Sequence, residues 1–186
     1  MVSAEVIAKL PKALRAISDE QGANAAVALL LRSGRGDFDL LLVKRVENPS
    51  DTWSGQMALP GGKREPDDLS LKDTAVRETL EETGVALTNC SFLGVLDAVR
   101  SEPLPDFKIS PFVVLLDCEP RLKLNKAELE TFVWVPYEGV VKSKGTVKFS
   151  FGEVPAYIFT EGIVWGITYN ILTEFIQAVE ATQNSG

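Results

Sequence analysis

The sequence predicts an α/β protein in which a mixed β-sheet carries helices on both faces. Short apolar runs of strand length alternate irregularly with helical patterns, and several neighbouring runs are close enough to form hairpins. One run, AAVALLL in residues 24–32, is apolar enough to be buried on both faces. The 186 residues, 45% of them hydrophobic and 24% charged, suit one domain with a sizeable core. We therefore expect residues 1–186 to form a single domain, with residues 1–22 as an N-terminal helical extension and residues 182–186 as a loose tail.

The N-terminal part of the chain predicts a helix and two strands. Apolar residues at spacings of three and four predict an amphipathic helix over residues 5–18: Val6, Leu10, Leu14 and Ile17. Pro11 interrupts this pattern and leaves open a start later in the segment. After the turn at Gln21-Gly22, residues 24–32 predict a strand, and the polar tip that follows predicts a hairpin to a second strand over residues 38–45.

Residues 46–60 predict an irregular loop, which contains two prolines and Trp53. Trp53 has two interpretations, a hydrophobic plug that holds the loop down and a ring that stacks on a substrate, and packing is the preferred one. The pair Gly61-Gly62 then predicts a glycine turn, which would let the backbone approach a ligand closely.

The next helix is defined at both ends. Ser70 can cap its first turn, with Asp73 as the acidic half of a capping box, and Gly84 can end it in a left-handed conformation. Four residues predict its apolar face: Leu71, Ala75, Val76 and Leu80. With this face, the glutamates need not be buried for the helix to pack.

Three glutamates of this helix, Glu78, Glu81 and Glu82, lie at spacings of three and four residues and therefore on one face. Like charges at these spacings repel, so the group indicates a bound cation. The alternative is the ordinary solvated surface of a glutamate-rich helix. Oxygen ligands alone select a hard ion, Mg²⁺ first and Mn²⁺ second. Arg77, one turn before Glu81, can pair with it and fix its rotamer.

The second half of the chain predicts further strands and a final helix. The predicted strands are residues 91–100, 108–117 and 129–135 and a hairpin of residues 147–151 and 156–160 around Gly152. From Gly162 onward the pattern is helical, with a buried stripe that consists of Ile163, Ile167, Ile171, Phe175 and Ile176. For Trp165, which lies in this segment, packing in the core is the preferred interpretation.

The composition excludes several kinds of site. The chain has no histidine, so it cannot contain a Ser-His-Asp triad, a Cys-His pair, a histidine metal site or an imidazole acid or base. A net charge of −7 argues against binding nucleic acid through a broad basic surface. Cys90 and Cys118 make no disulfide framework, and no signal-peptide pattern or run of membrane-spanning length is found. We therefore expect a soluble, cytoplasmic protein without nucleic acid or membrane partners.

The stretch from Gly61 to Val85, GGKREPDDLSLKDTAVRETLEETGV, resembles the signature of the Nudix hydrolase family. That signature runs Gly, five residues, Glu, seven residues, Arg-Glu, an aliphatic residue, any residue, Glu-Glu, any residue, Gly and an aliphatic residue. The matching positions are Gly62, Asp68, Arg77, Glu78, Thr79, Glu81, Glu82, Gly84 and Val85. Asp68 replaces the first Glu, and Thr79 replaces the aliphatic residue. Eight residues instead of seven separate Asp68 from Arg77, an insertion that falls before or at the helix start.

Two segments outside this stretch resemble the coenzyme A diphosphatase-like members of the same family. WSGQMALPGG is similar to their pattern of Gly, three residues and Phe-Pro-Gly-Gly, with Leu59 in place of the Phe. Upstream, residues 42–45 fit only part of their Leu-Leu-Thr-x-Arg-Ser pattern, because Val46 replaces the Ser. IVWGITYNIL resembles their Trp-Gly-x-Thr helix near the C-terminus.

The resemblance implies the Nudix α/β/α sandwich and Mg²⁺-dependent hydrolysis of the diphosphate linkage in a nucleoside diphosphate derivative, with a coenzyme A-like substrate favoured. It implies that Glu78, Glu81 and Glu82 hold Mg²⁺ or Mn²⁺, with a backbone carbonyl at Gly61 as a further ligand, and that Arg77 orients Glu81. The residues expected to contact substrate are Arg45, Trp53, Gly62 and Lys63. Family members place the general base differently, so Glu82 and Glu161 are both candidates.

Two alternatives to this function stay open. The substrate can instead be ADP-ribose, a dinucleotide polyphosphate or an oxidised nucleoside triphosphate. A nucleotide-binding module that has lost catalysis is disfavoured because the glutamate set is intact. The sequence leaves monomer and homodimer open.

Overall fold

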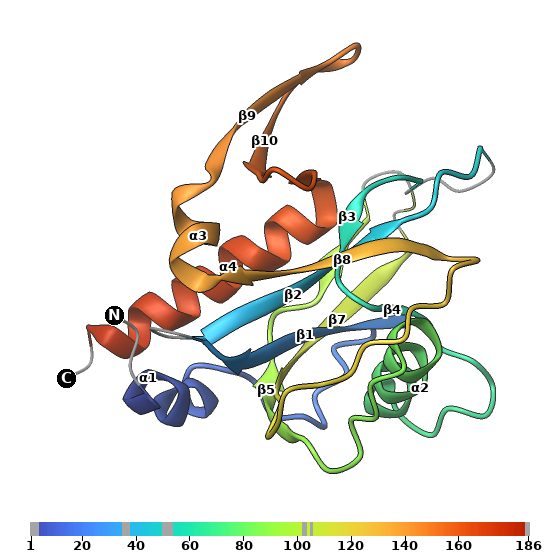
Figure 1. The fold of residues 1–186 in the computed structure, drawn as a ribbon. Helices are drawn as coiled ribbons and strands as arrows, with labels where there is room; N and C mark the ends of the chain where they lie inside the picture. The colour runs from blue at the N-terminus through green and yellow to red at the C-terminus, as the bar shows by residue number, and fades with distance from the viewer. Residues whose placement is uncertain (1–3, 35–37, 50–53, 102–103, 105, 185–186) are drawn as a thin grey trace.

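Strand β1 (Ala25–Ser33) is the centre of the main sheet because three other strands pair with it (Figure 1). Along one edge it runs parallel to β7 (Lys108–Leu115). Two antiparallel strands share its other edge: β4 (Gly61–Lys63) pairs with its beginning, and β2 (Phe38–Arg45) pairs with its end. The sheet therefore divides along this edge of β1, between the part paired with β4 and the part paired with β2.

The structure is a computed structural model that describes residues 4–34, 38–49, 54–101, 104 and 106–184. Within these residues, the other strands of the main sheet are β3 (Met57–Ala58), β5 (Ser91–Val95), β6 (Val99–Arg100) and β8 (Leu129–Pro136). A second sheet has the order β11-β10-β9 and consists of β9 (Lys144–Phe149), β10 (Gly152–Ile158) and β11 (Ile163–Trp165). The helices are α1 (Ala4–Lys9), α2 (Leu71–Thr83), α3 (Tyr137–Lys142) and α4 (Gly166–Gln183), with a 3₁₀ turn at Leu10–Lys12.

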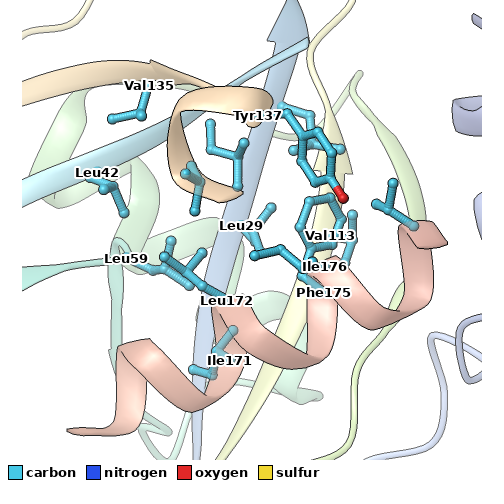
Figure 2. Close-up of a cluster of buried hydrophobic side chains, with 14 of the residues drawn as sticks. Leu29, Leu42, Leu59, Val113, Val135, Tyr137, Ile171, Leu172, Phe175 and Ile176 are labelled. Atoms are coloured by element: carbon cyan, nitrogen blue, oxygen red, sulfur yellow. The ribbon is translucent and has the colours of Figure 1, made fainter. Parts of the chain in front are cut away.

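Helices cover both faces of the main sheet, as the sequence predicts. Successive side chains of β1 point to opposite faces, so Leu29 and Leu31 join the cluster that includes α4. Leu30 joins a second cluster, which includes the apolar residues of α2. Figure 2 shows the first cluster, in which Leu172 of α4 packs toward the sheet. The prediction that this strand is buried on both faces is confirmed.

The predicted hairpin between the first two strands is also confirmed, since Leu31 pairs with Leu40 and Ser33 with Phe38. Most of its polar tip, residues 35–37, lies outside the described residues. The strand expected over residues 91–100 is divided into β5 and β6. Between them, the side chain of Gln21 accepts a hydrogen bond from the amide of Ala98 and donates one to the carbonyl of Leu96, each at 2.9 Å. A side chain thus replaces a strand neighbour there.

The N-terminal helix is shorter than predicted and begins before Pro11, so the alternative of a later start is wrong. Helix α1 passes into the 3₁₀ turn that contains Pro11, whose backbone nitrogen has no hydrogen to donate. Beyond it the helix does not continue, and Arg15 forms an antiparallel bridge with Val95. Leu14 and Ile17 therefore pack separately, in different hydrophobic clusters.

The C-terminal helix begins later than predicted, at Gly166, because residues 163–165 form strand β11 and pair with β10. Its buried side includes Ile171, Phe175 and Ile176 as expected. The tail is not loose from Thr182 onward, since α4 continues through Gln183 and Thr182 is buried.

The hairpin around Gly152 is confirmed as β9 and β10, which extend away from the main sheet (Figure 1). Trp165 is partly buried at this second sheet, with its ring centroid 4.9 Å from that of Phe149. Both cysteines are free. None of the helices in the described ranges has the length and apolar character needed to cross a membrane.

Candidate active site

Helix α2 is held at both ends as predicted. The Ser70 hydroxyl accepts a hydrogen bond from the amide of Asp73, and the Asp73 carboxylate accepts one from the amide of Ser70. Gly84 ends the helix with φ of 72°, a left-handed conformation that glycine adopts without strain. These caps fix where the helix starts and stops, and with it the position of each glutamate along its axis.

The face that α2 buries differs from the predicted one. Leu80 is 48% exposed, whereas Glu82 is 3% exposed and Thr79 is fully buried. Leu71 and Ala75 do pack into the core as expected. The prediction that Leu80 belongs to the buried face is therefore wrong: the helix is rotated so that Glu82 faces the sheet, although the apolar face did not require a glutamate to be buried.

Strand β4 explains why a glutamate is buried here. The Gly61 amide donates a hydrogen bond to Glu82 Oε2 at 2.9 Å. A Cβ atom on Gly62 would lie 2.4 Å from Glu78 Oε1, so only glycine leaves room for that carboxylate. The expected glycine turn is instead a short strand paired with β1. The strand still allows the close approach that the sequence predicts, because its two glycines let two carboxylates of α2 lie against the backbone.

Arg77 is fixed mainly by Asp68 rather than by Glu81. Its guanidinium donates to both oxygens of Asp68, from Nε at 3.1 Å and from Nη2 at 2.9 Å. Nη1 donates to Glu78 Oε1 at 2.9 Å and to Glu81 Oε2 at 3.3 Å, and Nη2 also donates to the carbonyl of Lys63. The hydrogen bond to Glu81, the one that the sequence predicts, is the longest of these five.

A cavity of about 280 Å³ lies where the main sheet divides, next to the glycines of β4. Of the residues predicted for the site, those that line it are Arg45, Gly61, Gly62, Lys63, Glu78 and Glu82. Arg77 and Glu81 do not line it. Trp53 lies outside the described residues. The structure therefore brings most of the predicted site into one pocket.

The pocket also contains a residue that the sequence analysis missed, Glu128, which lies in the segment before β8. Burial is the main reason why the pKa values of Glu78 and Glu82 are raised, and the charge of Glu128 adds to this effect at both. No local pattern marks Glu128, because it stands 46 residues after Glu82 and is brought to the pocket by contacts between distant segments: β8 pairs with β2, and the Asn125 amide donates a hydrogen bond to the Glu82 carbonyl. Glu161, a candidate for the general base, is exposed and does not line the pocket.

The carboxylates of the site are in contrasting electrostatic environments. Burial raises the pKa of Glu82 to about 8, although the Gly61 amide partly opposes this. Burial also raises the pKa of Glu78, against the effect of its hydrogen bond from Arg77. Asp68 is the opposite case, since its hydrogen bonds from Arg77 hold its pKa well below the usual range. The pocket therefore favours protonation of its own carboxylates or the binding of a cation.

A divalent metal ion fits this donor set. The pocket carboxylates, Glu78, Glu82 and Glu128, offer only oxygen, which suits a hard ion. Within the described part of the chain, no three His, Cys, Asp or Glu side chains form a group that could hold a metal ion as they stand. Glu81 is the outlying member, with its side chain 55% exposed and bonded to Arg77. The structure thus joins two of the three predicted ligands and leaves the third at the rim.

Comparisons with known proteins find a matching family model and similar sequences. The family model described as NUDIX domain matches residues 22–153. An uncharacterized protein of Schizosaccharomyces pombe is 41% identical over 103 residues, which are 52% of this chain and 31% of that protein. The chain thus spans less than a third of that relative. A mitochondrial coenzyme A diphosphatase of Homo sapiens, NUDT8, is 29% identical over 161 residues, which are 82% of this chain and 67% of that protein.

Solved structures share the fold. The NUDIX domain of Shewanella oneidensis NrtR, complexed with ADP ribose, superimposes with a TM-score of 0.56 at 19% identity and covers 95% of this chain and 98% of that one. A Nudix hydrolase from M. smegmatis, RenU, superimposes with a TM-score of 0.58 at 18% identity, covering 86% of each chain. At these identities the likeness concerns the fold alone.

Proposed function

The chain belongs to the NUDIX domain family, and on that premise we propose that it is a metal-dependent hydrolase of the diphosphate linkage in nucleoside diphosphate derivatives. One observation carries the proposal: Glu78 and Glu82 of α2 are held against the glycines of β4 inside a pocket that also contains Arg45 and Lys63. Carboxylates suit a metal ion, and the two cationic side chains suit phosphate oxygens. An acidic protein needs such local positive charge to attract a diphosphate.

We propose that the carboxylates of the site bind the metal ion and that Arg77 positions them. Glu78, Glu82 and the Gly61 carbonyl would hold Mg²⁺, with Mn²⁺ as a substitute, and Glu128 adds a further carboxylate. When bound, the ion would neutralise phosphate charge and lower the pKa of the attacking water. Glu81 would join the ligand set by giving up its 3.3 Å hydrogen bond from Arg77, the weakest that Arg77 makes by distance. Arg77 keeps Glu78 in place through its anchor on Asp68.

Substrate binding and water activation complete the mechanism. Arg45 and Lys63 would bind phosphate oxygens, and Gly62, which lines the same pocket, leaves room for the Glu78 carboxylate beside them. Water attacks one phosphorus, the bridging P–O bond breaks, and the leaving phosphate takes the bridging oxygen. A pocket carboxylate accepts the water proton. We infer that it is Glu82 or Glu128 rather than Glu161, because Glu161 does not line the pocket.

Within this class we favour a coenzyme A-like substrate. Support comes from the two segments that resemble coenzyme A diphosphatase-like members, WSGQMALPGG and IVWGITYNIL, and from the similarity to NUDT8. Both segments supply pocket residues, among them Leu59 and Thr168. We also propose that residues 1–186 form one domain, because α1 and α4, although outside the matched residues 22–153, pack on the same sheet.

A hydrolysis panel with Mg²⁺ tests the proposal. The substrates are coenzyme A, ADP-ribose, NADH, diadenosine polyphosphates and nucleoside triphosphates, and the matched control is Glu78→Gln. We expect diphosphate derivatives to be hydrolysed, coenzyme A best, with turnover lost in the variant. Preference for ADP-ribose or a dinucleotide polyphosphate would contradict the proposed coenzyme A-like substrate and leave the proposed reaction unchanged. Turnover of triphosphates alone, or no turnover at all, would contradict the proposed reaction, and the second outcome would favour a binding module.

A further inference from the structure

The pocket has a second half whose chemistry does not serve the diphosphate. Apart from the charged groups, its walls are largely apolar, and they include Val27, Leu59, Phe107, Ile109, Ile167 and Ile171. A diphosphate and its metal ion gain nothing from apolar neighbours, because both are strongly hydrated charges. The apolar surface therefore suits another part of the substrate.

Strand β4 shows how the two halves are joined. Its three residues contact three different groups in succession: Gly61 hydrogen-bonds Glu82, Gly62 lies against Glu78, and the ammonium of Lys63 lies 5.6 Å from the ring centroid of Phe107. Phe107 is thus next to the cation that would bind a phosphate. A group attached to that phosphate would reach the ring directly.

Phe107 is suited to a planar partner. It is the one aromatic side chain among the described residues that line the pocket, and it is partly exposed there. Aromatic rings stack on nucleobases whatever the base, since every base presents a π-face. The backbone of Phe107 is held in place, because its amide donates to the Leu104 carbonyl, its carbonyl accepts from the Ser101 amide, and the next residue, Lys108, begins β7.

Helix α4 supplies the rest of this wall, through Ile167, Thr168 and Ile171 in its first two turns. These residues lie outside residues 22–153, the part that matches the family model. The helix is nevertheless fixed firmly, since Leu172 and Phe175 are fully buried beneath the sheet (Figure 2). Helix α4 therefore adds a rigid wall to the diphosphate site from outside the residues that match the family model.

We propose that Phe107 and the first turns of α4 form the subsite for the nucleobase of the substrate, with the base stacked on Phe107 and confined by Ile167. This inference rests on the proposed function, because it places the base relative to the diphosphate. It applies to any adenine-containing member of the substrate panel. Discrimination among nucleotide derivatives then starts at Phe107 and α4, while Glu78 and Glu82 serve the bond that is cleaved.

The test compares two ligands that differ only in the base. The dissociation constants of AMP and ribose 5-phosphate are measured by calorimetry with Mg²⁺ present. In the wild type we expect AMP to bind roughly tenfold to a hundredfold more tightly than ribose 5-phosphate, the range that stacking on one aromatic ring provides. Phe107→Ala is expected to abolish this ratio by weakening AMP alone, and Phe107→Tyr to keep it. Ile167→Trp, which fills the space, is expected to weaken AMP in the same way.

Controls separate this inference from the proposed function and from misfolding. Phe151→Ala removes an aromatic side chain that is 67% exposed on the second sheet, and it should leave the ratio unchanged. Glu78→Gln should abolish turnover and keep the ratio. Thermal melts verify that each variant is folded. Equal binding of the two ligands by the wild type, or a ratio that survives both Phe107→Ala and Ile167→Trp, would overturn the base subsite. If the wild type hydrolysed none of the substrates but still bound AMP more tightly than ribose 5-phosphate, the proposed function would be overturned and the base subsite would stand.

Discussion

Arg77 and Asp68 form a two-pronged ion pair, in which Nε and Nη2 of the arginine each donate to a different oxygen of the carboxylate. Asp68 is buried and accepts two further hydrogen bonds, from the Thr74 hydroxyl and from the Glu65 amide. The residue that departs from the family signature, aspartate in place of glutamate, is therefore the anchor of the arginine beside Glu78. Such a buried carboxylate matters because it fixes Arg77 in one orientation.

Asp68→Asn should lower both stability and turnover. Removing the charge weakens a hydrogen-bonded ion pair, so we expect the free energy of unfolding to fall by about 2 kcal/mol near neutral pH. Turnover should fall roughly tenfold to a hundredfold, because Arg77 no longer holds Glu78 firmly. The folded-state pKa of Asp68 lies below its unfolded value, so its stabilisation is present above pH of about 4 and is lost as the pH falls through the folded pKa. Thermal melts at several pH values measure this, with exposed Asp67→Asn as the control. A variant that melts like the wild type at neutral pH would contradict it.

Glu82→Gln should abolish most turnover without loss of stability. Gln keeps an acceptor for the Gly61 amide and removes the charge that would hold the metal ion, so we expect turnover to fall roughly a hundredfold or more. Added Mg²⁺ should raise the melting temperature of the wild type more than that of the variant. Near-normal turnover, or equal stabilisation of both proteins by Mg²⁺, would show that this carboxylate is not a metal ligand.

Without metal, the stability of the wild type and that of Glu82→Gln should depend differently on pH. Burial raises the pKa of Glu82 from its ordinary 4.5 to about 8, so between these values the folded state binds more protons than the unfolded state. The stability of the wild type should therefore decline as the pH rises through this window. Glu82→Gln should lose the part of that decline that Glu82 contributes and keep the part from Glu78, whose pKa burial also raises, whereas Glu81→Gln, whose side chain is exposed at the rim, should keep the whole decline. Melting curves in a chelator from pH 5 to about pH 8 provide the measurement, and parallel curves for the wild type and Glu82→Gln would count against the buried charge.

Alanine at each of the two glycines should separate folding from catalysis. A Cβ on Gly61 would lie 2.2 Å from the Ala26 carbonyl oxygen, and the backbone φ is +149°, so Gly61→Ala should lower stability by roughly 1–3 kcal/mol. A Cβ on Gly62 would meet the end of the Glu78 side chain, which can move. Gly62→Ala should therefore melt close to the wild type and lose turnover. The reverse pattern in melts and assays would refute the assignment of the two glycines.

Thr79→Val should stabilise the protein. Thr79 is fully buried, and its hydroxyl has no hydrogen-bond partner among the described residues. Valine has a similar shape and no unsatisfied group, so we expect a gain of about 1 kcal/mol with unchanged turnover. Thr83→Val is the matched control, since the Thr83 hydroxyl donates to the carbonyl of Thr79 at 2.6 Å and its removal should destabilise. Chemical denaturation measures both, and destabilisation by Thr79→Val would show that the hydroxyl is satisfied in solution.

The parts of this site that could be predicted from sequence are those fixed by local chemistry. The ends of α2 are determined by local contacts. Ser70 and Asp73 bond to each other at its start, and Gly84 bonds to the Leu80 carbonyl at its end. The spacing of Glu78 and Glu82 follows from helical geometry alone. For the same reason the strand of residues 24–32 was predictable, since its apolar run requires burial on both faces.

The parts that could not be predicted depend on contacts between distant segments. Glu82 is buried because β4 presents an amide to it, and no helical pattern indicates that rotation of α2. Glu128 reaches the pocket through the pairing of β8 with β2 and the hydrogen bond from the Asn125 amide to the Glu82 carbonyl. The observed end of α1 and the observed start of α4 differ from the predicted ones for the same reason. Arg15 bridges to Val95, and residues 163–165 pair with β10.

The pairing of β1 with β7 has a consequence for how the protein folds. This parallel ladder joins Ala25 to Ile109 and Leu31 to Leu115, so a long stretch of chain must close before it forms. Topologies dominated by such distant pairings fold slowly, on a scale of roughly milliseconds to seconds. Helix α2 lies inside that closed stretch and packs against β1, although its own caps can form early. We therefore expect the ends of α2 to be defined early and the pocket to form last.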